Sequence, residues 1–420
     1  MLLTFSFKNF GPFRDEATFD MRAIKSYKEH TSHCAELYGK QRVLKVAAMF
    51  GANASGKSSF VDAYYYFSSI VRDSFAHGSE GKSEGQSEIG LPNSRVPAIR
   101  RFYRPFRFSA PDEDRLTEFD ATFAAEDGEY RYGFSYDSKH VESEWLYFYR
   151  DGGARATVIL ERDSSDAEEP IKFGASLRRE AKKYAKDIPT DVLALSFFDG
   201  VALKTDAFRN ASDCVLSVLP LPPIGCGKLS DTLIQDLFSQ DFDKMKESAL
   251  LKFLGGIDIE IKGFRVKQNG EGEDVDVFTI HTGPDGRDYE APIEIESEGT
   301  RKLIGMYWYL NTALTRDATL ILDEMDSELH PLITHYLVKL FHMSKSRGQL
   351  IFTTHDPTLL DKKYLRRDQV WFADKNECGL STLRSLSEYR VRNDADLRSS
   401  YLGGAYDAVP SLRQALWGAE

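Results

Sequence analysis

Residues 51–58 have the spacing of a phosphate-binding loop, because they read GANASGKS and match the pattern G-x-x-x-x-G-K-S. The glycines allow backbone N–H groups to turn inward, and a helix that begins at the lysine adds its positive dipole end. Lys57 would then neutralise the β- and γ-phosphates, and the Ser58 hydroxyl would ligate Mg²⁺. The alternative is a glycine turn formed by chance. We expect ATP or GTP to contact Gly51, Asn53, Ala54, Ser55, Gly56, Lys57, Ser58 and Ser59.

Acidic residues and a histidine follow two short apolar runs in the last third of the chain. The run 319–322 ends in Asp323 and Glu324, and the run 350–353 is followed closely by His355. If both runs are neighbouring parallel strands, these side chains meet at the carboxyl edge of one sheet. Asp323 would then hold Mg²⁺, Glu324 would polarise a water molecule aimed at the γ-phosphate, and His355 would contact that phosphate. Without a phosphate-binding loop, such acids would indicate only strands that leave the core.

The sequence SEGTRK at 297–302 precedes a helical segment. Ser297 and Gly299 at a helix start would present a hydroxyl and N–H groups to an anion. The simpler alternative is an ordinary helix cap, for which Ser297 or Thr300 would suffice. We expect Ser297 and Gly299 to contact a nucleotide.

Periodicity predicts the elements that position these residues. Residues 2–8 alternate on a period of two, as in a strand, and 43–50 form an apolar run, as in a buried strand. Residues 58–71 contain no glycine or proline and predict a helix. Residues 76–94 are rich in Gly, Ser and Glu and predict a solvated loop. An antiparallel meander is expected at 106–108, 118–123, 130–136, 145–149 and 157–160.

The second half of the chain is expected to change from helices to alternating strands and helices. Residues 175–254 are expected to be largely helical, interrupted by LPLPP at 219–223. Predicted strands follow at 257–266, 275–281, 293–296, 319–322, 350–353 and 370–373. Predicted helices cover 300–315 and 328–343. This alternation indicates a parallel sheet with helices on both faces.

Composition limits the class of protein. The chain has 42% hydrophobic and 28% charged residues and a net charge of −11, which argues against a surface that binds nucleic acid throughout. The four cysteines lack the spacing of a zinc site, and reduced thiols in a cytoplasmic protein are expected. No apolar stretch is long enough to predict a membrane span, and the amino terminus does not resemble a signal peptide.

The order of the motifs resembles that of ABC-class ATPases: GANASGKS, then SEGTRK, LILDE, MDSELHP and TTHD. The start LLTFSFKNFGPF is similar to SMC-like and OLD-type members. The end, R-x-x-YLGGAY-x-x-VP from 398 to 410, is similar to bacterial AAA/OLD-like ATPases such as RloA-type proteins and the AriA subunit of the PARIS anti-phage system. The resemblance implies Mg-ATP hydrolysis, an ATP-sandwich dimer in which Ser297 and Gly299 reach the nucleotide of a second subunit, and possible higher oligomers.

The expected fold class is α/β, a split ABC-type P-loop ATPase domain with an antiparallel meander and a mostly helical middle insertion. The expected divisions are 1–160 for its first half, 161–255 for the insertion and 256–420 for its second half. OLD nucleases carry a Toprim domain after the ATPase, and residues 356–420 are too few for one. We therefore expect a regulatory ATPase of an abortive-infection system, with a separate effector such as a Toprim nuclease and a phage-encoded trigger.

Two other functions fit parts of the sequence. A RecF/SMC-type repair ATPase would bind DNA directly, and the candidate patch is basic with interleaved aromatic residues. The patch consists of Arg95, Arg100, Arg101, Arg104 and Arg107, with Phe102, Tyr103, Phe106 and Phe108. A sheet face with basic residues outward is the simpler interpretation. An ABC transporter ATPase fits less well, because such domains are usually shorter.

Overall fold

The computed structural model describes residues 1–37, 41–75, 96–108, 116–150, 153–175, 177, 181–200, 206–221, 228–239, 242–268, 275–392 and 395–410. The predicted loop at 76–94 lies outside these ranges, as do Arg95 and Cys226.

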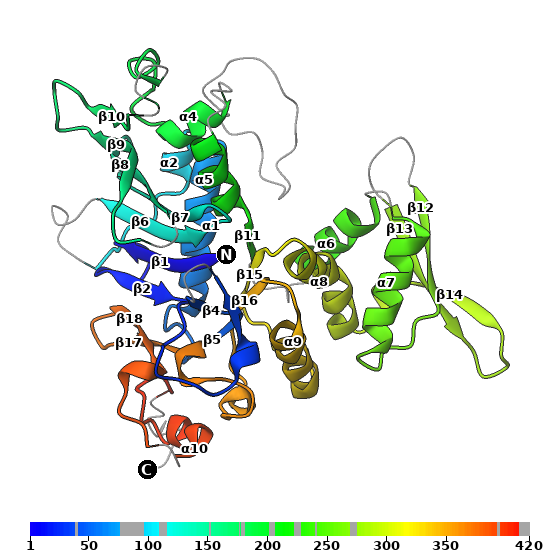
Figure 1. Ribbon diagram of the computed structural model, residues 1–420. Helices are drawn as coiled ribbons and strands as arrows, with labels where there is room; N and C mark the ends of the chain where they lie inside the picture. The colour runs from blue at the N-terminus through cyan, green and yellow to red at the C-terminus, as the bar shows by residue number, and fades with distance from the viewer. Residues whose placement is uncertain are drawn as a thin grey trace, which may run out of the picture.

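One layer is a seven-stranded sheet in which all neighbours are antiparallel (Figure 1). Its order is β10-β9-β8-β7-β6-β1-β2. The strands are β1 (Leu2–Lys8), β2 (Ala17–Asp20), β6 (Thr117–Ala124), β7 (Gly128–Tyr136), β8 (Val141–Arg150), β9 (Thr157–Asp163) and β10 (Ile171–Phe173). In β1, Leu3, Phe5 and Phe7 are buried and alternate with partly exposed residues, as the sequence period of two predicts.

The second layer is a six-stranded sheet in the order β11-β15-β16-β5-β17-β18. Its strands are β11 (Val218–Leu221), β15 (Thr319–Leu322), β16 (Gln349–Thr353), β5 (Val46–Gly51), β17 (Val370–Lys375) and β18 (Ser381–Ser385). All neighbours are parallel except β17 and β18. Strands β5, β15 and β16 are buried along their whole length, which explains their unbroken apolar runs. The predicted α/β fold is confirmed.

Helices cover both faces of the parallel sheet. Helix α1 (Lys57–Asp73) lies between the two sheets, and its Tyr64 ring packs 4.9 Å from that of Phe5 on β1. The opposite face packs against α8 (Glu298–Thr315), α9 (Pro331–Met343) and α10 (Leu397–Leu402). Alternate residues of the parallel strands therefore belong to two separate apolar cores.

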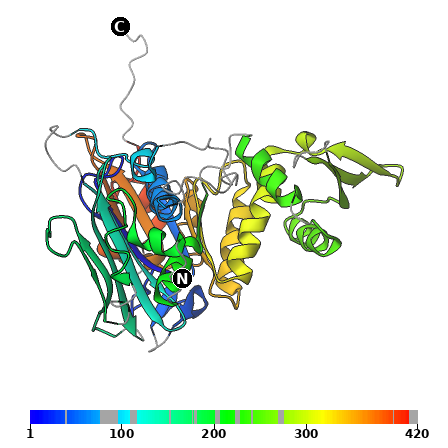
Figure 2. The ribbon, with the colours of Figure 1, turned by 90° about the horizontal axis from the view of Figure 1, so that it is seen from above.

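Smaller elements complete the described chain. Strands β3 (Cys34–Glu36) and β4 (Arg42–Leu44) pair with each other, and helices α2 (Ala98–Arg101), α4 (Ala194–Gly200) and α5 (Asp206–Leu216) precede β11 in the chain. A projecting unit contains α6 (Lys228–Ser239), α7 (Lys244–Gly255) and the sheet β12 (Gly263–Gln268), β13 (Val275–Thr282) and β14 (Asp288–Pro292). Figures 1 and 2 show it extending beyond α8, away from the two large sheets.

Three sequence predictions in the second half of the chain need correction. Residues 218–221 form β11, an edge strand of the parallel sheet, and Pro220 fits there because an edge strand can lack one ladder hydrogen bond. Residues 293–295, predicted as a strand, form a short 3-10 helix after Pro292. The predicted strand at 257–266 begins only at Gly263, and Asp258, within the predicted range, has a left-handed backbone (φ 65°) that a strand does not contain. Among the described residues, no helix is long and apolar enough to cross a membrane.

Candidate nucleotide-binding site

The loop between β5 and α1 has the backbone that a phosphate-binding loop requires. Ala54 and Gly56 have positive φ angles of 62° and 110°, which turn the chain sharply before the helix. At Gly51 a Cβ atom would lie only 2.4 Å from the carbonyl oxygen of Ala373 on β17. Gly51 is therefore required by close packing, and Gly56 by its backbone conformation.

Lys57 is the first residue of α1, and its side chain folds back over the loop. Its ammonium donates to the carbonyl oxygens of Gly51 at 2.9 Å and Ala52 at 3.0 Å. Burial lowers the pKa of Lys57, while the nearby carboxylates of Asp323 and Glu324 raise it. The lysine thus provides a buried positive charge beside the N-terminus of a 17-residue helix.

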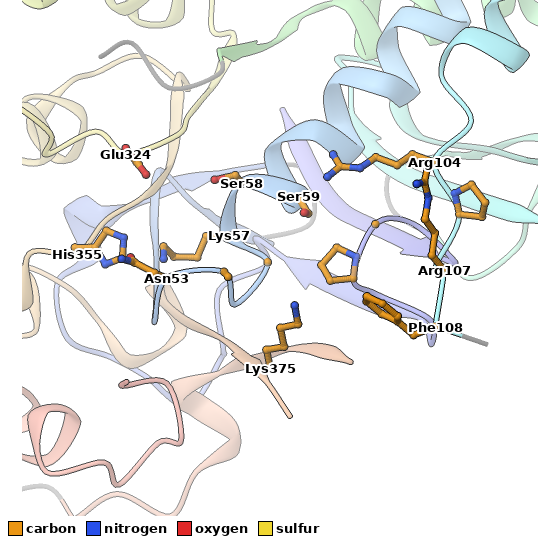
Figure 3. A pocket seen from close by; sticks show the side chains of 15 residues that line it. Asn53, Lys57, Ser58, Ser59, Arg104, Arg107, Phe108, Glu324, His355 and Lys375 are labelled. Carbon is orange, nitrogen blue, oxygen red and sulfur yellow. The ribbon is translucent and has the colours of Figure 1, made fainter. Parts of the chain in front are cut away.

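A cavity of about 710 Å³ lies over this loop. Its lining brings together most of the predicted residues: Asn53, Ala54, Gly56, Lys57, Ser58, Ser59, Glu324 and His355. Figure 3 shows Glu324 and His355 on one side of Lys57, and Arg104, Arg107 and Phe108 on the opposite side. Gly51 and Ser55 are buried in the loop itself and do not line the cavity.

Asp323 follows β15, is buried, and does not line the cavity. Its Oδ1 atom accepts a hydrogen bond of 2.5 Å from the Thr353 hydroxyl at the end of β16. Its Oδ2 atom is buried and has no hydrogen-bonding partner among the described residues. An unpaired buried carboxylate oxygen fits a site for Mg²⁺ or a water molecule bound to it, with the exposed Ser58 as a second oxygen ligand.

Glu324 and His355 are positioned by neighbours that sequence reasoning did not single out. Glu324 has a left-handed backbone (φ 47°), and its N–H donates to the Thr353 hydroxyl at 2.7 Å. The backbone N–H of His355 donates to Asp326 Oδ2 at 3.1 Å. Burial lowers the pKa of the His355 imidazole, and the charge of Lys57 lowers it further. Thr353 could have been found from the sequence, because it occupies the last position of the strand before His355.

Lys302 is a second residue that the sequence did not reveal. It lies on α8, is fully buried, and donates to the carbonyl oxygens of Glu324 and Ser327 at 2.9 Å and to the Ser327 hydroxyl at 2.7 Å. Burial lowers its pKa to about 8, although Glu328 and the other acids of this loop raise it. A lysine after Gly-Thr-Arg would normally be assigned to a solvated helix face, so only the fold identifies this contact.

Ser297 and Gly299 lie at the start of α8 and do not line the cavity of their own chain. Ser297 caps the helix, accepting from the Thr300 N–H at 3.1 Å. At Gly299 a Cβ atom would lie 2.5 Å from the carbonyl oxygen of Glu328. The glycine therefore allows α8 to pack directly against the loop that follows Glu324.

A model of the family described as "AAA domain, putative AbiEii toxin, Type IV TA system" matches residues 46–361. The chain belongs to this AAA family. The match includes the loop 51–58, Glu324 and His355 of the cavity described above, the buried Asp323 beside it, and Ser297 at the start of α8.

Solved structures similar to this AAA-family chain include SMC heads. The SMC head domain from Thermotoga maritima is 12% identical, with 93% of this chain and 99% of that chain covered and a TM-score of 0.41. A second structure is the Smc head domain with an extended coiled coil bound to the C-terminal domain of ScpA, derived from Pyrococcus furiosus. It is 14% identical, with 92% of this chain and 97% of that chain covered and a TM-score of 0.40. Among curated proteins, no match is found.

Two arginines of the candidate DNA patch form ion pairs within the described part of the chain. Arg101 pairs with Asp73 at 2.7 Å, and Arg104 pairs with Asp62 at 2.7 Å. Phe102 and Phe106 are buried, and the predicted strand at 106–108 is not formed. Arg104, Arg107 and Phe108 instead line the same cavity as Lys57.

Proposed function

We propose that this protein binds and hydrolyses Mg-ATP and that nucleotide binding controls a separate effector protein. The observation that carries the first part is the convergence on one cavity of a phosphate-binding loop and an acidic strand end. These segments are far apart in the chain. The arrangement of a lysine, an unpaired aspartate oxygen and a glutamate supports phosphoryl transfer to water as the class of reaction.

Each residue has a defined role in this proposal. Loop N–H groups and Lys57 bind the β- and γ-phosphates, and Glu324 accepts a proton from the attacking water. His355 contacts the γ-phosphate and reports its loss. Ser58 and Asp323 would hold Mg²⁺, which when bound neutralises charge on the phosphate oxygens.

A second subunit completes the site in this proposal. Ser297 is exposed and caps the start of α8, and Gly299 lies in its first turn. Neither lines the cavity of its own chain, and we propose that both face the nucleotide of another copy. ATP would then hold two copies together, and hydrolysis would separate them. Higher homo-oligomers are compatible with the projecting unit.

The effector is proposed to be a separate protein in an anti-phage, abortive-infection system. The family description names an AbiEii toxin and a type IV TA system, which supports a two-component arrangement. The resemblance to RloA-type and AriA ATPases points to a Toprim-type nuclease, a phage-encoded trigger and a cytoplasmic location. Direct action on DNA is less well supported, because two patch arginines form ion pairs and two patch aromatics are buried.

The catalytic assignment is tested with two variants and one control. Lys57→Ala should abolish ATP binding in calorimetry, whereas Glu324→Gln should bind ATP normally and hydrolyse it at least about a hundredfold more slowly. Glu324→Gln should also form an ATP-dependent dimer, measured by light scattering. Glu294→Gln, an exposed glutamate outside the cavity, serves as the control. Wild-type turnover in Glu324→Gln would refute its role as the general base.

The regulatory role needs a different experiment. The ATPases that this chain resembles are encoded beside small partner proteins, so the full chain is expressed with the product of the neighbouring gene. Both proteins are tested for ATP-dependent association and for phage resistance. We expect Lys57→Ala to lose resistance. Unchanged phage sensitivity after deletion of the gene would refute the defence role without affecting the ATPase assignment.

A further inference from the structure

The end of the cavity farthest from Glu324 is built from three segments that are distant in sequence. They are the turn after β1 with Gly11 and Pro12, the segment 104–108, and Lys375 at the end of β17. Figure 3 shows this end on the opposite side of Lys57 from Glu324 and His355. A nucleotide whose γ-phosphate faces Glu324 must extend its ribose and base toward these segments.

The turn after β1 fixes all three segments relative to the phosphate-binding loop. Gly11 N–H donates to the carbonyl oxygen of Arg104 at 2.8 Å, and the Pro12 carbonyl oxygen accepts from Ser381 N–H on β18 at 2.9 Å. The Phe13 ring lies so close to Gly56 that a Cβ there would be 2.9 Å from it. This end of the cavity is therefore preorganised next to the loop.

Phe108 is the unusual side chain at this end. It is 74% exposed, whereas Phe106 is buried. Its ring is edge-on to Phe106 with centroids 5.7 Å apart, and it lies next to Gly379, where a Cβ atom would be 3.3 Å from the ring. The ring is thus supported by two neighbours and still presents most of its surface to solvent at the cavity, which suits a flat ligand.

The polar groups at this end are cationic. Arg107 and Lys375 are exposed and form no ion pair within the described residues, in contrast to Arg104, which is paired with Asp62. The described lining residues here, namely Gly11, Pro12, Arg104, Pro105, Arg107, Phe108 and Lys375, include no carboxylate and no side-chain amide. The lining therefore offers stacking surface and positive charge but few side-chain acceptors with which to distinguish adenine from guanine.

We propose that this end is a base-tolerant nucleobase subsite, in which the base stacks on Phe108 while Arg107 and Lys375 attract the nucleotide's phosphate charge. The inference rests on the proposed function, because the phosphates must lie on the loop 51–58. Stacking on an aromatic ring accepts any base, since every base has a π-face. ATP and GTP should therefore bind with similar affinity.

The test compares three ligands, ATP, GTP and inorganic tripolyphosphate, by calorimetry on the full chain. We expect Phe108→Ala to weaken ATP and GTP about tenfold or more, to a similar degree, and to leave tripolyphosphate within about twofold of wild type. Phe108→Trp should keep wild-type affinity for both nucleotides. Tyr289→Ala, an exposed aromatic on β14 outside the cavity, should change nothing.

The outcomes separate this inference from the proposed function. Unchanged ATP affinity in Phe108→Ala, or an equal loss for tripolyphosphate, overturns the stacking role. Wild-type discrimination between ATP and GTP of more than about tenfold overturns base tolerance. Lys57→Ala tests the proposed function independently, because it should lose all three ligands whatever the role of Phe108.

Discussion

Lys302 links helix α8 to the loop that begins at Glu324, the proposed general base. Its ammonium has three N–H donors, and all three bind neutral oxygen atoms of the loop that begins at Glu324. The same helix, α8, begins at Glu298 and is capped by Ser297. A shift of α8 on contact with a second subunit would therefore move the Glu324 backbone through Lys302.

Lys302→Met should lower kcat by roughly tenfold to a hundredfold, because a glutamate displaced by about 1 Å is a poor general base. The affinity for ATP should change little, since Lys302 does not line the cavity. Steady-state kinetics and calorimetry measure the two effects separately. Lys302→Arg should restore part of kcat, whereas Lys339→Met, an exposed lysine on α9, should behave as wild type. Equal losses of kcat and ATP affinity in Lys302→Met would indicate general misfolding.

The lowered pKa of Lys302 also predicts a pH dependence of stability. Its folded pKa is about 8, below the usual 10.5, so between these values the unfolded chain binds more protons than the folded one. Its contribution to the free energy of unfolding should therefore rise from pH 8 to pH 10.5. Urea titrations of wild type and Lys302→Met measure the free energy of unfolding across this range, and wild type should gain stability relative to the variant as the pH rises. If the difference between the two free energies does not change with pH, the pKa of Lys302 is not lowered in the folded protein.

At the scale of elements, sequence patterns identified the strands and helices that carry the site. Buried parallel strands such as β15 and β16 are unbroken apolar runs, and α1 follows directly from the loop motif, so local sequence suffices. Strand β11 was missed because Pro220 indicates an interruption unless the strand is known to lie at a sheet edge. The contacts of Lys302 and the proposed role of Phe108, which the sequence placed in a candidate DNA patch, were missed for a related reason, since both arise between distant segments.

The Asn9 side chain forms hydrogen bonds to the backbone of both Phe106 and Leu116. Its Oδ1 accepts from Phe106 N–H at 2.9 Å, its Nδ2 donates to the Leu116 carbonyl at 3.1 Å, and its φ is 52°. Asn9→Ala should increase amide hydrogen exchange at Phe106 and lower the free energy of unfolding by about 1–3 kcal/mol, because it leaves buried groups unpaired and strains the backbone.

Two further variants separate the causes. Asn9→Gly keeps the left-handed backbone but loses the side chain, and Asn9→Asp keeps the acceptor for Phe106. Exchange at Phe106 should therefore increase in Asn9→Gly and stay near wild type in Asn9→Asp. If amide hydrogen exchange at Phe106 is as slow in all three variants as in wild type, the Asn9 side chain does not stabilise the backbone at Phe106.

At the scale of the molecule, Gln349 joins the two large sheets. It is fully buried on β16, its Oε1 accepts from Leu2 N–H and Thr319 Oγ1 at 2.7 Å, and its Nε2 donates to the Leu2 and Leu44 carbonyls at 3.0 Å. Gln349→Leu should lower the free energy of unfolding by roughly 2–5 kcal/mol, because it leaves several buried polar groups unpaired. Chemical denaturation measures this loss. Gln268→Leu, at an exposed position, should stay within about 0.5 kcal/mol of wild type.

Strand β5, which delivers the phosphate-binding loop, lies between β16 and β17. On the ribosome, β5 is synthesised early, but both of its neighbours lie beyond residue 348. At typical rates of translation this interval lasts about 15–60 s, during which an apolar strand has neither flanking partner. A nascent chain stalled before residue 349 should therefore bind no nucleotide and should attract chaperones, whereas one released after β17 has emerged should bind it.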